Sequence, residues 1–262
     1  MMVVKVGGSR GINYDFVLED LIRYQDVILV HGGSDELNVL STRLGKPPQI
    51  INSASGHVSR RTDRETLELF NMVYCGKMNK MIVEKLQRLG TNAVGLSGLD
   101  GRLLIGKRKD IISIENGRRR IIRDDYTGRV EKVNIELLRI LMQHGFLPVV
   151  TPPALSYENE AINVDGDRVA ALIASHLHAD TLVILSNKPG LLRDESDETS
   201  IVKEVTEETY EQALSYAKER MKKKMLGAFE ALNSGVSQVI FGDARVREPI
   251  TKALQGQGTV IH

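Results

Sequence analysis

The sequence predicts an α/β protein with a mainly parallel central sheet and helices packed on both of its faces. Three observations support this fold class. Short apolar runs recur along the chain, each run ends at glycine or small polar residues, and longer segments with helical periodicity lie between them. Repetition of strand, glycine-containing turn and helix is typical of a doubly wound sheet.

Five apolar runs are predicted to be strands, at residues 3–6, 26–30, 147–150, 181–185 and 238–241. Each run is rich in Val, Ile and Leu and lacks the polar alternation of a half-exposed strand, so we expect both of its faces to be buried. Ligands of such sheets bind at the carboxyl ends of the strands. The turns that follow the runs are therefore the first place to look for a site.

Helices are predicted over residues 64–89, 167–178 and 206–220. In the first, apolar residues recur at steps of three and four, which favours an amphipathic helix. Asp63 can cap its N-terminus, whereas Gly76 in its middle should cost about 1 kcal/mol relative to alanine.

Segment 107–125 departs from the repeated strand, turn and helix, because it alternates apolar with polar residues around Asn116 and Gly117. That dipeptide suits a type I′ turn, so we predict an exposed hairpin. Its basic face would be formed by Arg108, Lys109, Arg118, Arg119, Arg120 and Arg123. A solvated run of charge is the alternative interpretation.

The composition excludes several classes of protein. The 35 Lys and Arg residues nearly balance the 34 Asp and Glu residues, which argues against a nucleic-acid partner. Cys75 is the single cysteine, and no Cys/His cluster is present to hold zinc. No signal peptide or apolar run approaching 18 residues is visible, so we expect a cytoplasmic protein without a membrane partner. No repeat or long linker divides the chain, which predicts one domain over residues 1–262 with lobes at 1–180 and 181–262.

Two glycine pairs predict a phosphate site. Gly7 and Gly8 follow the first strand, Gly32 and Gly33 follow the second, and each pair precedes a serine and an expected helix. Glycine lets backbone N–H groups approach an anion, and a helix N-terminus adds positive potential. Either pair alone is often only a tight turn, and neither belongs to a dinucleotide fingerprint or a P-loop.

Charged residues supply the second indication of a site. Lys5 lies inside a valine run, where its desolvation is costly unless an anion meets it, although a lysine on an edge strand could point to solvent. Asp165 and Asp167 precede an apolar helix, where they can cap the helix or hold lysines or a metal. The run Lys222–Lys224 is either a solvated face or the start of a helix that reaches a nucleotide.

Six segments resemble the amino acid kinase family, in the N-acetylglutamate kinase branch, over essentially the whole chain. They are, in order, "KVGGS", "HGGS", "SRRTDRETLELFNMVYCGKMNK", "NVDGDR", "LVILSNKPGLL" and "MKKKMLGAFEAL". The third and fourth most resemble kinases that act on aminoadipate or glutamate carried by LysW, the small acidic amino-group carrier protein. The resemblance implies a three-layer αβα sandwich, the amino acid kinase fold.

The resemblance also assigns roles to residues. Lys5 and Lys224 would neutralise the transferring phosphoryl group, and Asp167 would orient both lysines, with Asp165 and Lys222 or Lys223 as alternatives if the register slips. The substrate would be bound by Gly32, Gly33, Arg60 and Asn163. ATP would be bound by Gly7, Gly8, Ser186, Asn187, Lys188, Gly190 and Leu191.

The implied reaction transfers a phosphoryl group from ATP to a carboxylate, in lysine or arginine biosynthesis. The acceptor is ionised at pH 7, so no general base is needed, and His31 is interpreted as a turn or packing residue. We expect Mg²⁺ to arrive with ATP, no protein metal site, and a homodimer. Free N-acetylglutamate is the alternative substrate, and a non-catalytic nucleotide-binding protein is the alternative class. Glutamate and aminoadipate differ by one methylene, worth only about 1 to 3 kcal/mol, so both remain open.

Overall fold

An eight-stranded sheet forms the centre of the protein, in a computed structural model that describes residues 1–52, 58–115 and 118–262. Its strand order is β14-β16-β15-β13-β1-β2-β10-β5. Neighbouring described strands are parallel except β15 and β16. The bounds are β1 Met2–Val6, β2 Val27–His31, β5 Ala93–Ser97, β10 Leu147–Thr151, β13 Thr181–Ser186, β14 Glu204–Val205, β15 Gln238–Asp243 and β16 Thr259–Ile261.

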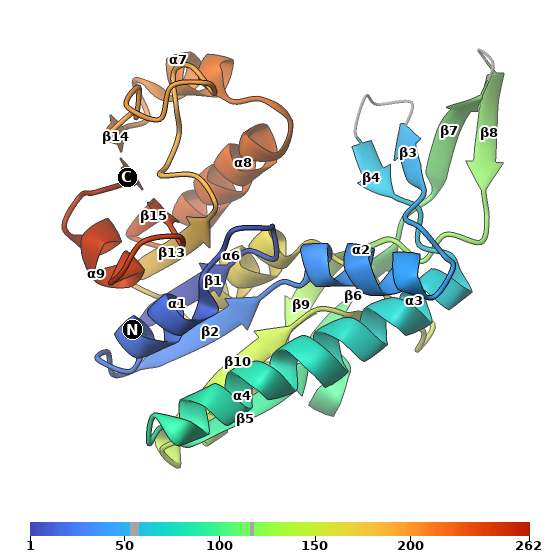
Figure 1. Ribbon diagram of the computed structural model, residues 1–262, viewed down its shortest axis with the longest axis horizontal. Coiled ribbons are helices and arrows are strands. Elements are labelled where there is room, and N and C mark those ends of the chain that lie inside the picture. Colours follow the sequence, from blue (N-terminus) through green and yellow to red (C-terminus); the bar gives the residue numbers. More distant parts are fainter. Residues whose placement is uncertain (53–57, 116–117) are drawn as a thin grey trace.

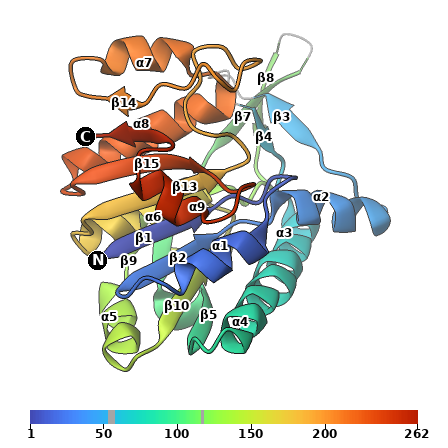
Figure 2. The ribbon, with the colours of Figure 1, turned by 60° about the vertical axis from the view of Figure 1, so that its left-hand side comes forward.

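Helices cover both faces of this sheet (Figure 1, Figure 2). One hydrophobic cluster joins the sheet to α5 Ile135–Gln143, α6 Gly166–His176 and α8 Glu219–Asn233. A second cluster, on the opposite face, joins it to α1 Tyr14–Leu21, α4 Asn79–Arg88 and α9 Pro249–Leu254. The predicted three-layer fold with a mainly parallel sheet is therefore confirmed, and the five predicted strands are β1, β2, β10, β13 and β15.

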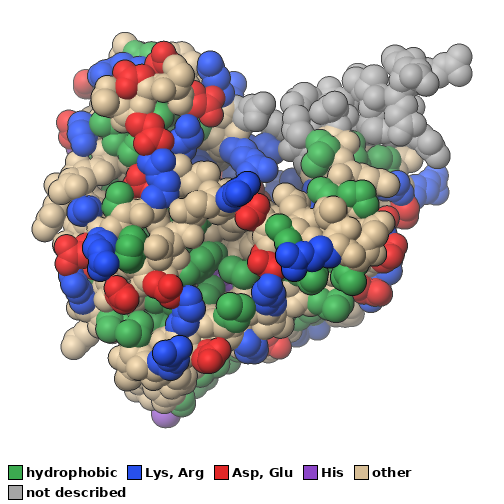
Figure 3. Space-filling model, in the orientation of Figure 1, with side chains coloured by type: hydrophobic (Ala, Val, Ile, Leu, Met, Phe, Trp, Pro, Cys, Tyr) green, Lys and Arg blue, Asp and Glu red, His purple; other side chains and the backbone are tan. Residues whose placement is uncertain are grey.

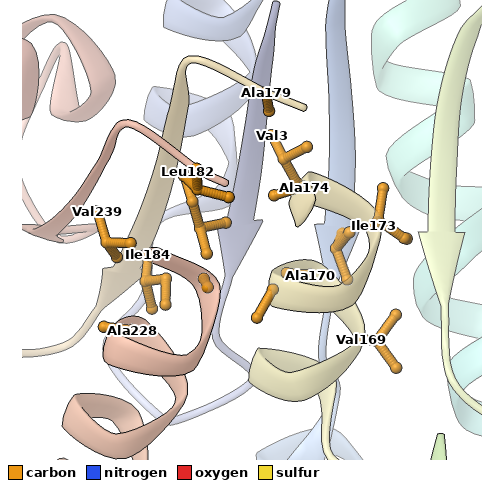
Figure 4. Packing of buried hydrophobic residues seen from close by; sticks show 14 of the residues in the cluster. Val3, Val169, Ala170, Ile173, Ala174, Ala179, Leu182, Ile184, Ala228 and Val239 are labelled. Carbon is orange, nitrogen blue, oxygen red and sulfur yellow. The ribbon is translucent and has the colours of Figure 1, made fainter. Parts of the chain in front are cut away.

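Alternation along β1 determines where Lys5 points. Val3 packs in the cluster beneath α6, whereas Val4 packs in the cluster on the other face. Figure 4 shows Val3 and Leu182 lying against the helix that carries Ala170 and Ala174. Because side chains of a strand alternate between faces, Lys5 lies on the same face as Val3. Its ammonium group therefore extends toward α6.

The predicted helix over 64–89 is a single helical stretch with a change of geometry in its middle. It comprises α3 Arg64–Asn71, the π-helical segment Met72–Met78 and α4. Asp63 caps it as expected, since its carboxylate accepts a hydrogen bond from the Thr66 N–H (2.9 Å). Gly76 lies within the π-helical turns.

The predicted extent of the helix over 206–220 is wrong. Here the structure has α7 Tyr210–Tyr216, then Ala217 and Lys218 in extended conformation, and then α8. The Thr209 hydroxyl accepts a hydrogen bond from the Thr206 N–H (2.9 Å), and such local side-chain bonds compete with helix. Because α8 begins at Glu219, after the extended residues, Lys222–Lys224 lie in its first two turns.

Three smaller sheets accompany the central one in the described part of the chain, and of these only the two hairpins extend from one end of the molecule. One has the order β12-β11-β6-β9, and the others are the hairpins β3–β4 and β7–β8, which stand side by side (Figure 1). The predicted hairpin over 107–125 is present as β7 and β8, but its turn at Asn116–Gly117 and the side chains of Arg118, Arg119 and Arg120 lie outside the described part. The bounds are β3 Ile50–Asn52, β4 Val58–Arg60, β6 Leu104–Arg108, β7 Ile111–Glu115, β8 Arg118–Ile122, β9 Gly128–Val133, β11 Ala154–Ser156 and β12 Ala161–Ile162.

The remaining helices are α2 Ser34–Arg43 and a 3-10 turn at Asp100–Arg102. Among the described helices, none has the length and apolar character required to cross a bilayer.

Because β1 pairs with both β2 and β13, the central sheet continues across residue 180, and the division into lobes at that point remains a prediction.

We predict that Asp63→Ala lowers the free energy of unfolding by about 1 kcal/mol at pH 7, the usual cost of a lost N-cap. Partial burial raises the pKa of Asp63, but bonds from Lys46 and Thr66 outweigh it and lower the pKa to about 2. The cap therefore stabilises the fold fully above the unfolded-state pKa of about 3.9 and is lost as the pH falls toward 2. Urea unfolding of both proteins at pH 7 and across pH 4 to 2 should show the difference shrinking with acidity. A difference independent of pH would contradict this.

Candidate active site

A cavity of about 680 Å³ opens at the carboxyl ends of β1, β2 and β13. Figure 3 shows a hollow between the α8 side and the α2 side of the molecule, with Lys and Arg side chains at its rim. It is the place where ligands of open α/β sheets bind. The lining includes most of the predicted site residues, namely Lys5, Gly7, Gly8, Gly32, Asp167, Ser186, Asn187, Lys188, Gly190, Leu191 and Lys224.

Two lysines meet one carboxylate inside this cavity. Lys5 on β1 forms an ion pair with Oδ1 of Asp167, at the start of α6. Lys224 Nζ on α8 donates a hydrogen bond to Oδ2 of the same residue, at 2.8 Å. All three side chains are largely buried, with exposed fractions of 8%, 13% and 19% for Lys5, Lys224 and Asp167.

The electrostatics of this triad follow from its burial. Burial by itself raises the pKa of Asp167, but the ammonium groups of Lys224 and Lys5 outweigh it and hold that pKa well below its usual range. Burial and the charge of Lys5 lower the pKa of Lys224, while Asp167 opposes the change. Two lysines beside one aspartate give the triad a formal charge of +1 toward the cavity. The arrangement is suited to attract an anion.

The structure separates the tasks of the two neighbouring aspartates. Oδ1 of Asp165 accepts hydrogen bonds from the N–H groups of Asp167 (2.8 Å) and Arg168 (3.1 Å), and so caps α6. Asp167, two residues later, holds the lysines. Lys224, the lysine named by the resemblance, pairs with Asp167, and its role in phosphoryl transfer stays a prediction.

The two glycine turns touch each other beside the triad. A Cβ atom on Gly8 would lie 2.3 Å from the backbone N of Gly33, so only glycine fits there. The Ser34 hydroxyl donates a hydrogen bond to the Gly8 carbonyl (3.0 Å), and the Tyr14 hydroxyl donates one to the Gly7 carbonyl (2.8 Å). The N-terminus of α2 begins at Ser34 and adds positive potential at the same edge.

Three predicted substrate residues are not among the described lining residues of the cavity. Gly33 packs against Tyr74, at 3.3 Å from where its Cβ would be. Nη2 of Arg60 donates a hydrogen bond to Asn38 Oδ1, and the buried Nη1 has no hydrogen-bond partner among the described residues. Nδ2 of Asn163 donates a hydrogen bond to the Thr62 hydroxyl (3.0 Å).

His31 is buried between the sheet and α4. Burial lowers its pKa to about 4, so the imidazole is neutral at pH 7. One ring nitrogen contacts the Gly32 carbonyl (3.1 Å) and the other contacts Nδ2 of Asn79 (3.0 Å). A neutral ring fixed on both sides fits a packing role.

Several residues that line the cavity were not predicted from the sequence. Tyr74 belongs to the apolar stripe of the helix over 64–88, and nothing in that pattern marks it as facing a cavity. Ser34 follows the second glycine pair, which was a usable signal. Arg220 and Tyr216 border the unpredicted break between α7 and α8, so their approach depends on that break. The described residues contain no group of three or more His, Cys, Asp or Glu side chains able to hold a metal ion.

The chain belongs to the amino acid kinase family, whose model matches residues 1–243. A protein of Deinococcus radiodurans named LysW-aminoadipate kinase is 58% identical, over 100% of this chain and 91% of that protein. A protein of Thermus thermophilus with the same name is 54% identical over 100% of both. A Saccharolobus islandicus protein named LysW-aminoadipate/LysW-glutamate kinase is 39% identical, over 100% of this chain and 99% of its own.

Solved structures show the same fold at lower identity. N-acetylglutamate synthase from Neisseria gonorrhoeae superimposes with a TM-score of 0.80 and 20% identity, over 99% of this chain and 58% of that chain. Carbamate kinase from Giardia lamblia, bound to AMP-PNP, has a TM-score of 0.67 and 14% identity, over 99% of this chain and 98% of that chain. At these identities the likeness concerns the fold alone.

We predict that Gly8→Ala separates the two glycine turns, because the new methyl would meet backbone atoms of Gly33 and Ser34 at 2.3 and 2.5 Å. Overpacking of this kind typically costs about 1 to 3 kcal/mol of stability. A displacement of about 1 Å at the site should lower turnover about 100-fold. Thermal unfolding and steady-state kinetics measure the two effects.

Gly76→Ala is the matched control for this substitution. A Cβ at Gly76 meets nothing within 4 Å, and alanine favours helix. We expect unchanged turnover and equal or slightly higher stability. Equal losses in both variants would show that the contact at Gly8 is not the cause.

We also predict that Asp167→Asn lowers kcat by about 100- to 1000-fold, the range for removal of one preorganised electrostatic group. The neutral amide no longer holds the two ammonium groups together. Asp165→Asn is the control, because asparagine caps a helix about as well as aspartate, and kcat should fall less than tenfold. If Asp165→Asn proved the more damaging change, the assignment of the two aspartates would be reversed.

Proposed function

We propose that this protein transfers the γ-phosphoryl group of ATP to the side-chain carboxylate of 2-aminoadipate held by LysW. The observation that carries the proposal is the Lys5–Asp167–Lys224 triad, which places two ammonium groups at one point of a cavity bordered by two glycine turns. The relatives at 58% and 54% identity are named for this activity and match all of this chain.

The chemistry requires alignment and charge neutralisation rather than a base. The acceptor is a carboxylate, already ionised near pH 7, so one of its oxygens can form the new P–O bond directly. The bond from the γ-phosphorus to the β–γ bridging oxygen breaks, ADP leaves, and the product is an acyl phosphate. Lys5 and Lys224 offset the repulsion between the two anions, while Asp167 keeps both lysines in position.

The cavity offers two sides to the two substrates. We assign the nucleotide to the side lined by Ser186, Asn187, Lys188, Gly190 and Leu191, with its phosphates at Gly7 and Gly8. Mg²⁺ would accompany the phosphates, since it usually binds through them and water. The acceptor then lies toward Gly32, Gly33, Arg60 and Asn163, in the lobe of residues 1–180. The unpartnered Nη1 of Arg60 is suited to a substrate carboxylate.

The carrier protein would approach over the two hairpins. Lys109 and Arg123 are exposed at the base of β7 and β8, and Arg61 lies at the end of β4, where it pairs with Asp124. Positive charge at this rim would steer an acidic carrier toward the cavity, whereas a free acetyl group gains nothing from it. This favours carrier-linked substrate over N-acetylglutamate.

We further place the protein in the cytoplasm, in lysine biosynthesis, as a homodimer. The helix over 64–88 exposes Met72 and Met81, which are suited to a contact with a second copy. Activity on LysW-linked glutamate, as in the name of the Saccharolobus islandicus relative, would add arginine biosynthesis.

The test is a hydroxamate assay with three acceptors side by side: LysW-linked aminoadipate, LysW-linked glutamate and free N-acetylglutamate. We expect the highest kcat/KM for LysW-linked aminoadipate. We expect that value to fall as salt rises from 50 to 500 mM, because screening weakens the steering. Turnover of N-acetylglutamate alone would contradict the proposal. ATP binding without turnover of any acceptor would favour a non-catalytic nucleotide-binding protein.

A further inference from the structure

Three distant segments meet behind the acceptor side of the cavity. They are the residues after β4, the residues before β9 and Asn163, which precedes α6. The Tyr126 N–H donates to the Thr62 carbonyl (2.7 Å), the Asn163 N–H donates to the Tyr126 carbonyl (2.8 Å), and the Gly128 N–H donates to the Asn163 carbonyl (2.8 Å). This backbone ladder connects the base of both hairpins to the segment that carries Asp167.

Thr62 lies at the centre of this junction and is fully buried. Its hydroxyl donates a hydrogen bond to the Arg60 carbonyl (3.3 Å) and accepts one from Nδ2 of Asn163 (3.0 Å). A carbonyl can only accept, so the direction of both bonds is fixed. The Asn163 amide must therefore turn its NH₂ group toward Thr62 and its Oδ1 away from it.

Asp125 fixes Thr62 in turn. It is 2% exposed, its Oδ2 accepts a hydrogen bond from the Thr62 N–H (3.0 Å), and its Oδ1 accepts one from the Thr127 N–H (2.8 Å). A buried carboxylate with two backbone donors is a rigid support, because moving either donor leaves a buried polar group unpaired.

We propose that Thr62, supported by Asp125, is the positioning residue for the acyl acceptor. One hydroxyl sets both the backbone of Arg60 and the orientation of the Asn163 amide, so it sets the affinity for the acceptor and not for the nucleotide. The inference rests on the proposed function, in that Arg60 and Asn163 are taken to bind the acceptor. Thr62 itself does not line the described cavity and is not a catalytic residue.

Thr259 offers a matched comparison on the nucleotide side. It is also fully buried, and its hydroxyl also makes two bonds, accepting from the Leu191 N–H (2.8 Å) and donating to the Val202 carbonyl (2.6 Å). Leu191 lines the cavity in the segment assigned to ATP. Thr62→Val and Thr259→Val each remove one buried hydroxyl that makes two hydrogen bonds. The two hydroxyls lie on opposite sides of the proposed site.

The experiment compares Thr62→Val, Thr62→Ser and Thr259→Val with the parent enzyme by steady-state kinetics. For Thr62→Val we expect the KM for the acceptor to rise about tenfold, as for loss of a typical buried hydrogen bond, with the KM for ATP changed less than about twofold. Thr62→Ser retains the hydroxyl and should stay within about threefold of the parent for both substrates. Thr259→Val should show the opposite split, with the effect on ATP.

Equal changes in both KM values for Thr62→Val, or no rescue by serine, would reduce Thr62 to a structural residue and overturn the proposal. If Thr62→Val fails to fold, Asp125→Asn provides the same test, because it disturbs the Thr62 N–H bond. It should also raise the KM of the acceptor selectively, and equal changes would again overturn the proposal. ADP affinity, measured by calorimetry, should match the parent in each Thr62 variant.

The parent enzyme separates this proposal from the proposed function. If the parent does not use LysW-linked aminoadipate, the proposed substrate is wrong. The variants are then compared on whichever of the three acceptors the parent turns over, and the split between the two KM values tests Thr62 independently. If the parent turns over none of them, the proposal fails together with the function on which it rests.

Discussion

The meeting of Lys5, Asp167 and Lys224 is the interaction on which the rest of this structure depends. Two ammonium groups and one carboxylate are withdrawn from water, which is unfavourable unless the charges compensate one another. Compensation requires that a central strand and two helices place their side chains at one point. The parallel sheet provides this, because β1 lies between β2 and β13 and presents Lys5 beneath α6. The fold and the site therefore require the same arrangement of β1, α6 and α8.

The triad keeps one positive charge in excess, and the surrounding backbone adds to it. The turns at Gly8 and Gly33 approach each other more closely than any side chain would permit, and α2 begins at the same edge. Positive potential from ammonium groups and from a helix N-terminus thus converges where the proposed reaction brings two anions together. A carboxylate acceptor needs no proton removed, which is consistent with the neutral, buried His31 beside the site.

Two supports hold the two sides of the cavity independently. On the acceptor side, Thr62 and Asp125 connect the base of the hairpins to Asn163 through buried hydrogen bonds. On the nucleotide side, Thr259 fixes Leu191 from the edge of the sheet. Because these supports share no described bond, the proposed assignment of the two sides predicts that the two affinities can be adjusted separately. Such separation suits a family whose members keep one fold and accept different substrates.

The sequence by itself determined five strands of the central sheet, the Asp63 cap and the glycine turns at the cavity, because burial on both faces, helix capping and glycine turns leave local patterns. It did not determine the break between α7 and α8, the π-helical turns or the place of Tyr74 in the cavity. These depend on contacts between segments far apart in the chain. Tertiary structure also decided which aspartate caps α6 and which holds the lysines, since both have the same local chemistry. The resemblance favoured Asp167 for the lysines, and the direction in which α6 faces β1 and α8 brings Asp167 to both lysines and Asp165 to the backbone.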